Sequence, residues 1–246
     1  MCLVAVLYRV VEDAPILIAA NREERFDRAS LSPRKYRGPP SYVCGLDQEA
    51  GGTWLGVNQH GLLVAVTNRH RAGLTAAPRS RGLLCRDLLS CESAQEAVDM
   101  AREKLIAGSY AGANYLCIDR DHGAVVHGGQ EIDTRDIEPG LHLLTNGDLD
   151  DPDDRVQTLA RRLIGDGHIE TVDRFLEVTA CVCAHKGVVI RRPDAGTVSS
   201  DQVAVTRNSR DAVYRHAPGP PDRLDYDDCS DLLRTVLSGS NRPDGG

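Results

Sequence analysis

Short apolar runs separated by turn residues recur along most of the chain, and this pattern predicts a protein rich in β-strands. The aliphatic runs 3–11 and 15–20 flank Glu-Asp-Ala-Pro, which is typical of a turn, so we expect an antiparallel hairpin. With the turn centred near residues 12–13, residue i lies opposite residue 25 − i, to within about two positions. The residues expected beside Cys2 are therefore Arg22, Glu23 and Glu24.

Further strands are expected where apolar runs lie between Gly, Asn and Pro turns. They cover residues 41–46, 53–57, 62–67, 114–119, 123–128, 140–145, 202–206 and 212–216, and the last of them ends the part expected to be ordered. Helical spacing, with capping residues such as Ser93 and Thr171, predicts helices over 81–91, 93–107, 154–164 and 170–183. The polar segment 29–41, with its prolines, is expected to be a surface loop, and the tail 241–246 to be frayed.

The order of these elements indicates an α+β protein. Two groups of strands, each followed by a pair of helices, favour layered sheets covered by helices over a parallel βαβ fold. Neither G-x-G-x-x-G nor G-x-x-x-x-G-K-[ST] occurs, so a phosphate-binding loop is not expected. With 246 residues and 41% apolar content, we expect one domain over residues 1–240.

Composition excludes several classes of partner. The net charge of −7 disfavours nucleic acid or an anionic membrane surface, because both attract basic faces. No apolar run approaches the roughly 20 residues of a membrane span, so we expect no membrane span and a cytoplasmic protein. The eight cysteines lack the density of a secreted disulfide scaffold. Cys181, Cys183 and His185 lack the paired spacing of a zinc site, so no metal or cofactor is expected. The sequence does not indicate an oligomeric state.

Cys2 could supply a nucleophile together with its own base. A small second residue permits removal of Met1, which would leave a thiol and a free α-amino group on one carbon. Polar residues at the ends of predicted strands are candidates to face this group, namely residues 21–24, Asn68 and Asn146. Each could instead be an ordinary strand-ending residue, because Asn tolerates the left-handed conformation.

Five short motifs follow one another along the chain, namely AANREER, GGTWLG, VTNRH, SRG at 80–82 and LLTN. They keep the order found in the transport and Golgi organisation protein 2 family, also called the NRDE family, and the chain resembles that family. The resemblance covers residues 1–160 well and the remainder loosely. The family is similar to the Cys-type N-terminal nucleophile hydrolases, such as penicillin acylases and bile salt hydrolases, whose chains begin Met-Cys. The resemblance therefore implies a four-layer αββα sandwich of two antiparallel sheets.

The resemblance also implies a set of catalytic residues. Cys2 would be the nucleophile, Arg22 and an acid would flank it, Asn68 would help to form the oxyanion hole, and Asn146 would orient the amine. The third letter of the NRDE motif is Glu23 here instead of Asp, and the spacing leaves Glu23 and Glu24 as alternatives for the acid. For a second arginine of acylase sites, Arg207 is the candidate.

The chemistry implied is acyl transfer through a thioester. A Cys2 thiolate, favoured by the charge of Arg22, would attack an amide or an acyl thioester, and water or an amine would then accept the acyl group. The residues predicted to contact the substrate are Asn21, Glu24, Trp54 and Thr67. Trp54, the one tryptophan of the sequence, could equally be a core aromatic.

Two other interpretations stay open at this point. Because the family is linked to haem handling and to lipid or coenzyme A metabolism, the protein could be a non-catalytic carrier of haem, lipid or acyl-CoA, with Cys2 or His70 as a ligand. Alternatively, Cys2 is an ordinary residue of the first strand, and residues 21–24 form a structural cluster of ion pairs. A covalent adduct on Cys2 would distinguish the enzyme from both.

Overall fold

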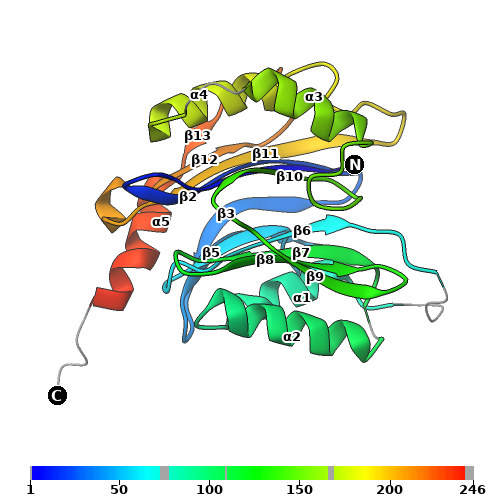
Figure 1. The fold of residues 1–246 in the computed structure, drawn as a ribbon, viewed down its shortest axis with the longest axis horizontal. Coiled ribbons are helices and arrows are strands. Elements are labelled where there is room, and N and C mark those ends of the chain that lie inside the picture. The colour runs from blue at the N-terminus through cyan, green and yellow to red at the C-terminus, as the bar shows by residue number, and fades with distance from the viewer. Residues whose placement is uncertain (1, 73–77, 109, 166–168, 242–246) are drawn as a thin grey trace. The chain divides into compact units, whose positions relative to one another are not determined.

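The computed structural model describes residues 2–72, 78–108, 110–165 and 169–241 (Figure 1). The chain forms two compact units, each with one antiparallel sheet. The first unit comprises Met1–Arg28 and Glu138–Ser230, and the second comprises Ala29–Ile137 and Asp231–Gly246. The single domain expected over residues 1–240 remains a prediction.

The first unit is built on an antiparallel sheet with the strand order β10-β1-β2-β11-β12-β13. Its elements are β1 (Leu3–Val11), β2 (Ala14–Arg25), β10 (Gly140–Leu144), α3 (Arg155–Ile164), α4 (Val172–Cys183), β11 (Ala195–Val205), the 3₁₀ turn η1 (Ser209–Asp211), β12 (Val213–Ala217) and β13 (Asp227–Asp228). Figure 1 shows α3 and α4 along one face of this sheet. Leu3, Ala5 and Leu7 of β1 form a buried core with Phe175 and Leu176 of α4. Because side chains alternate along a strand, Cys2 and Val4 point to the opposite face.

The second unit is built on an antiparallel sheet with the strands in chain order, β3 to β9. Its elements are β3 (Ser30–Tyr36), β4 (Tyr42–Asp47), β5 (Leu55–Asn58), β6 (Leu63–Asn68), α1 (Arg81–Leu88), α2 (Ala94–Ile106), β7 (Ala113–Ile118), β8 (Gly123–Gly128), β9 (Ile132–Asp136), α5 (Ser230–Leu237) and the 3₁₀ turn η2 (Ser238–Asn241). Figure 1 shows α1 and α2 along one face of the sheet. Val64 and Val66 of β6 pack there against Leu84 and Leu88 of α1.

The hairpin predicted at the N-terminus is confirmed, and its register places Cys2. Near the turn, Val11 lies opposite Ala14, which is the predicted sum of 25. A bulge between Tyr8 and Val11 then shifts the register by one, so that Leu3 lies opposite Asn21. One residue further on, Cys2 falls opposite Arg22.

The predicted helices are confirmed, with ends that differ by no more than three residues. The capping residues explain where they begin. The side chain of Ser93 accepts from the main-chain N–H of Glu96 before α2, and Thr171 accepts from that of Arg174 before α4. The predicted α+β class with two antiparallel sheets is also confirmed.

The polar edge strands were the main errors of the sequence prediction. The expected loop 29–41 contains β3, in which Pro33 is accommodated by a bulge between Leu31 and Arg34. Strand β9 was missed as well. Both strands lie at the edges of the second sheet, where side chains are largely exposed and carry little apolar periodicity.

Two elements near the C-terminus also differ from the prediction. Strand β11 begins at Ala195 and not near residue 202, because the polar stretch Gly196–Asp201 pairs with the end of β2. Helix α5 lies beyond the last predicted strand. Residues 242–246 of the tail expected to be frayed lie outside the described residues. Among the described segments, no helix has the length and apolar character needed to cross a membrane.

Candidate functional site

Cys2 lies at the start of β1 between two polar neighbours in the first sheet. The pairing of Val4 with Leu144 and of Leu3 with Asn21, continued toward the N-terminus, places Cys2 between Asn146 and Arg22. The main-chain N–H of Cys2 donates to Oδ1 of Asn146 at 3.4 Å. The structure therefore brings together the predicted nucleophile, the predicted amine-orienting residue and the predicted arginine.

Asn146 is held by hydrogen bonds between the end of β10 and the start of α3. Its neighbour Thr145 donates from Oγ1 to Oδ2 of Asp154, the N-cap of α3, at 2.5 Å. The buried Gln157 of α3 donates from Nε2 to the main-chain oxygen of Asp148 at 2.8 Å. These bonds fix the segment that follows β10, so Asn146 occupies a defined position.

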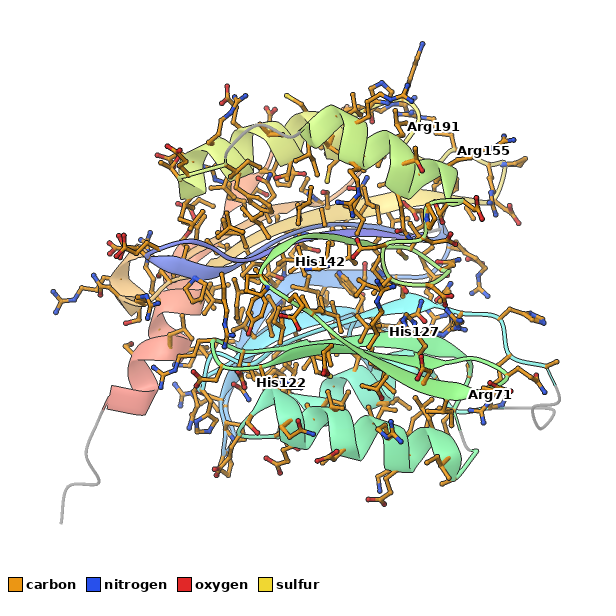
Figure 2. The ribbon with its side chains drawn as sticks, viewed as in Figure 1. Arg71, His122, His127, His142, Arg155 and Arg191 are labelled. Carbon is orange, nitrogen blue, oxygen red and sulfur yellow. The ribbon has the colours of Figure 1, made fainter. Side chains whose placement is uncertain are left out.

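The same segment is tied back to β10 through a second set of polar contacts. His142, labelled in Figure 2, shares a hydrogen bond of 2.7 Å between its Nδ1 and Oδ2 of Asp150. The other carboxylate oxygen of Asp150 accepts from the main-chain N–H of Leu143 at 2.9 Å and from Arg161 at 2.6 Å. Asp150 has a φ of 56°, a left-handed backbone conformation that is unfavourable for residues other than glycine, and these hydrogen bonds help to hold it there.

The acidic residues at the end of β2 have different surroundings. Oε2 of Glu24 lies 3.9 Å from Arg22 and 3.6 Å from Arg28. Glu23, by contrast, accepts from Oγ1 of Thr197 on β11 at 3.2 Å, and its main-chain oxygen accepts from the Cys2 thiol at 4.0 Å. Glu23 thus touches the Cys2 thiol through its main-chain oxygen, and its carboxyl acts on that thiol through charge. The choice between Glu23 and Glu24 as the catalytic acid remains a prediction.

Burial has the largest effect on the pKa values of the Glu23 carboxyl and the Cys2 thiol. It raises the pKa of the Glu23 carboxyl from 4.5 to about 7, while the positive charge of the chain's N-terminus, the hydrogen bond from Thr197 and the charge of Arg192 act in the opposite direction. Burial, together with the negative charge of Glu23, raises the pKa of the Cys2 thiol from 9.0 to about 11. Arg22 lowers this pKa, as expected, but by less than burial raises it. The thiol therefore needs a base to become a nucleophile at neutral pH.

In the second unit, three of the sequence motifs meet around Asn68. This residue ends β6 with its side chain exposed, and its Oδ1 accepts a hydrogen bond from Nη1 of Arg81 in the SRG motif. The main-chain N–H of Thr53, in the GGTWLG motif, donates to the main-chain oxygen of Gly82 at 2.9 Å. A Cβ atom on Gly52 would overlap the backbone of Gly82, so glycine permits this close approach.

Thr67 belongs to a buried polar network on the sheet face opposite to that of Val66. Oγ1 of Thr67 accepts from Nδ2 of Asn114 on β7 at 3.1 Å. Oδ1 of Asn114 lies 2.8 Å from Nδ1 of His127 on β8, which Figure 2 labels, and 3.3 Å from Arg69. The network fixes the amide of Asn114 and ties Thr67 into the sheet.

Trp54 and Asn21 are packed into their own units. The Trp54 ring lies over Gly45, where a Cβ atom would overlap it, and packs against the core of the second unit. Asn21 is buried, and its Nδ2 donates to the main-chain oxygen of Cys183 at 2.9 Å. Contacts of Asn21, Glu24, Trp54 and Thr67 with a substrate remain predictions.

Arg207 was a wrong candidate for the second arginine. Its main-chain N–H donates to Asp13 and its Nε to Glu12, each at 2.8 Å, so it sits at the hairpin turn. That turn is roughly 30 Å from Cys2 along β1, at about 3.3 Å per residue. Sequence reasoning missed Thr197 and Arg192, which come from a polar stretch without apolar periodicity, and Arg81, for which the SRG motif was a signal. Within the described residues, no His, Cys, Asp and Glu side chains gather as a metal site would require.

Residues 1–176 match the family described as Transport and Golgi organisation 2. The chain belongs to this family. Its relatives include the Transport and Golgi organization protein 2 homologs of Homo sapiens and Bos taurus, each 30% identical over 146 residues, which are 56% of this chain and 52% of theirs. The chain thus spans about half the length of the curated relatives that it matches. The family resemblance read from the motifs is confirmed.

Solved structures with the N-terminal nucleophile hydrolase fold are similar to this member of the family. Penicillin V acylase from Agrobacterium tumefaciens has a TM-score of 0.58 at 12% identity, over 88% of this chain and 83% of its own. The C2A mutant of conjugated bile acid hydrolase from Clostridium perfringens has a TM-score of 0.58 at 12% identity, over 94% and 93%. A Caenorhabditis elegans N-acylethanolamine-hydrolyzing acid amidase ortholog has a TM-score of 0.57 at 14% identity, over 96% and 98%. At these identities the likeness shows the fold, and the predicted fold class is confirmed.

Proposed function

We propose that this protein is an N-terminal nucleophile enzyme that transfers acyl groups from an amide or acyl thioester through Cys2. One observation carries the proposal: the main-chain nitrogen of Cys2 donates a hydrogen bond to the side chain of Asn146. Removal of Met1 would turn that nitrogen into a free α-amine. An ordinary strand residue needs no polar side chain at its main-chain nitrogen.

The α-amine is the base that the buried thiol requires. Its ordinary pKa is about 8, so at neutral pH it can accept the thiol proton when the thiolate attacks. Asn146 would orient the amine by accepting a hydrogen bond from it at Oδ1. Arg22 would favour the thiolate by its charge, and Glu23 would hold the protonated amine in place.

The reaction then follows as two acyl transfers. The Cys2 sulfur forms a bond to the substrate carbonyl carbon, and the amide of Asn68 donates to the oxygen that becomes negatively charged. The bond from carbon to the leaving nitrogen or sulfur breaks, and the leaving group takes the proton from the α-amine. Water, or an acceptor amine, attacks the thioester, gives up a proton and restores the free thiol.

The named activities of the structural neighbours support this class of reaction. They are described as an acylase, a conjugated bile acid hydrolase and an acid amidase, and in the second of these a cysteine at position 2 was replaced. This chain also carries a cysteine at position 2. Their low identity leaves the substrate of this protein to experiment.

Turnover of a panel of N-acyl amides and acyl thioesters tests the proposal. We expect release of the free acid by the wild-type protein and a loss of about 10³-fold or more in Cys2→Ala, because the nucleophile is gone. Cys181→Ala is the matched control, since Cys181 is exposed and its loss should leave turnover unchanged. Turnover that survives in Cys2→Ala would overturn the proposal.

A further inference from the structure

The bond between Arg81 and Asn68 determines which end of the Asn68 amide is available. A guanidinium group can only donate hydrogen bonds, so the amide atom that faces Nη1 of Arg81 must be the oxygen. The Nδ2 group of Asn68 consequently points away from Arg81. In the part of the chain that the structure describes, this Nδ2 donates to no other residue.

Arg81 is itself held in place by its surroundings in the second unit. It is the first residue of α1, directly after the N-cap Ser80, and its main-chain oxygen accepts from the hydroxyl of the buried Tyr115 at 3.1 Å. The next residue, Gly82, is bonded to Thr53 at 2.9 Å. The start of α1 is thus fixed against Thr53, just before β5, and against Tyr115 of β7, and Arg81 can impose an orientation on Asn68.

We propose that Arg81 is a positioning residue, which holds the side-chain amide of Asn68 so that Nδ2 is presented to the substrate carbonyl. The inference rests on the proposed function, in which Asn68 donates to the oxyanion. The two ends of an amide have nearly the same shape, so rotation by 180° costs little by itself. A rotated Asn68 would present Oδ1 to a negatively charged oxygen, which is repulsive and would cancel the benefit of the residue.

The first test measures the rate at which an acyl thioester acylates Cys2 in single-turnover experiments. We expect Arg81→Met, which keeps the apolar stem, to slow acylation by about tenfold, less than the roughly 10²- to 10³-fold loss of a whole oxyanion donor. Reversible binding of the thioester should be unchanged. Arg81→Lys should recover part of the rate, because it retains a donor.

The matched control is Arg79→Met. Arg79 lies two residues before Arg81, and its guanidinium carbon lies 4.9 Å from the centroid of the Tyr110 ring. Among the described residues it has no hydrogen bond to Asn68. We expect this variant to acylate at the wild-type rate. In the Asn68→Ala background, Arg81→Met should have no further effect, since the amide it orients is absent.

A structural role for Arg81 predicts a different pattern. Equal slowing by Arg81→Met with and without Asn68, or equal slowing by Arg79→Met, would overturn the inference. Should the wild-type protein not be acylated at all, the proposed function fails, and the side-chain amide resonances of Asn68 still decide the orientation. These resonances, identified by their absence in Asn68→Ala, should shift in Arg81→Met and stay in place in Arg79→Met; no shift in Arg81→Met would overturn the inference.

Discussion

The electrostatics around Cys2 depend on two neighbouring residues with opposite effects. Glu23 and burial raise the pKa of the thiol to about 11, and Arg22 lowers it. At pH 8 the thiolate is therefore a small fraction of Cys2, and its amount changes about tenfold for each unit by which the pKa shifts. A free α-amine is the remaining source of activation.

Replacing these two residues should change the reactivity of Cys2 in opposite directions. We expect Arg22→Ala to slow and Glu23→Gln to accelerate alkylation of Cys2 by iodoacetamide at pH 8, each by about threefold, for a shift of roughly half a pKa unit. Peptide mapping follows the Cys2 peptide alone. Arg25→Ala is the control, since Arg25 is exposed and pairs with Asp27 at 2.9 Å. Changes in the same direction for both variants would contradict this account.

The sequence predicted part of this residue-level arrangement. Counting back from the hairpin turn placed Cys2 beside Arg22, Glu23 or Glu24, because register follows from the turn, and the bulge between Tyr8 and Val11 then selects Arg22. The sequence could not describe the surroundings of the Glu23 carboxyl, since that carboxyl accepts from Thr197, which lies 174 residues away in the sequence. The orientation of Asn68 depends on Arg81, and no local pattern links those two side chains.

At the scale of elements, apolar periodicity predicted the buried strands and the amphipathic helices but not the polar edges. Strands β3 and β9 gain their order from pairing with a buried neighbour, and their own sequences carry few apolar residues. The early part of β11 is polar but buried, because it pairs with the end of β2 beside Cys2. Such polar, buried stretches are expected where a fold builds a functional site.

The close approach of two glycines fixes the start of α1 in the second unit. We expect Gly52→Ala to lower the free energy of unfolding by about 1–3 kcal/mol, because the added Cβ overlaps backbone atoms of Gly82 that cannot move independently. Denaturation by urea measures the change. Gly38→Ala is the control, since a Cβ there makes only an ordinary contact of 3.6 Å, and its effect should stay within about 0.5 kcal/mol. Equal effects of the two changes would contradict the role given to this contact.

At the scale of the whole molecule, the family match over residues 1–176 covers Cys2, Arg22, Glu23, Asn68 and Asn146. Asn68 belongs to the second unit and the other four residues to the first. The remaining part of the chain contributes Thr197, which bonds Glu23. The proposed chemistry accordingly requires the full chain, and its tests use the full chain.

The mass of the intact protein, before and after exposure to acylating compounds, tests the central claim most directly. We predict that the mature protein lacks Met1, and that acyl thioesters, activated amides, β-lactams or β-lactones add one acyl mass at Cys2. The adduct should be absent in Cys2→Ala and present in Cys181→Ala. Retention of Met1 in protein from the native host, or a Cys2 that stays unmodified by every compound while haem binds stoichiometrically, would contradict the account and favour the carrier.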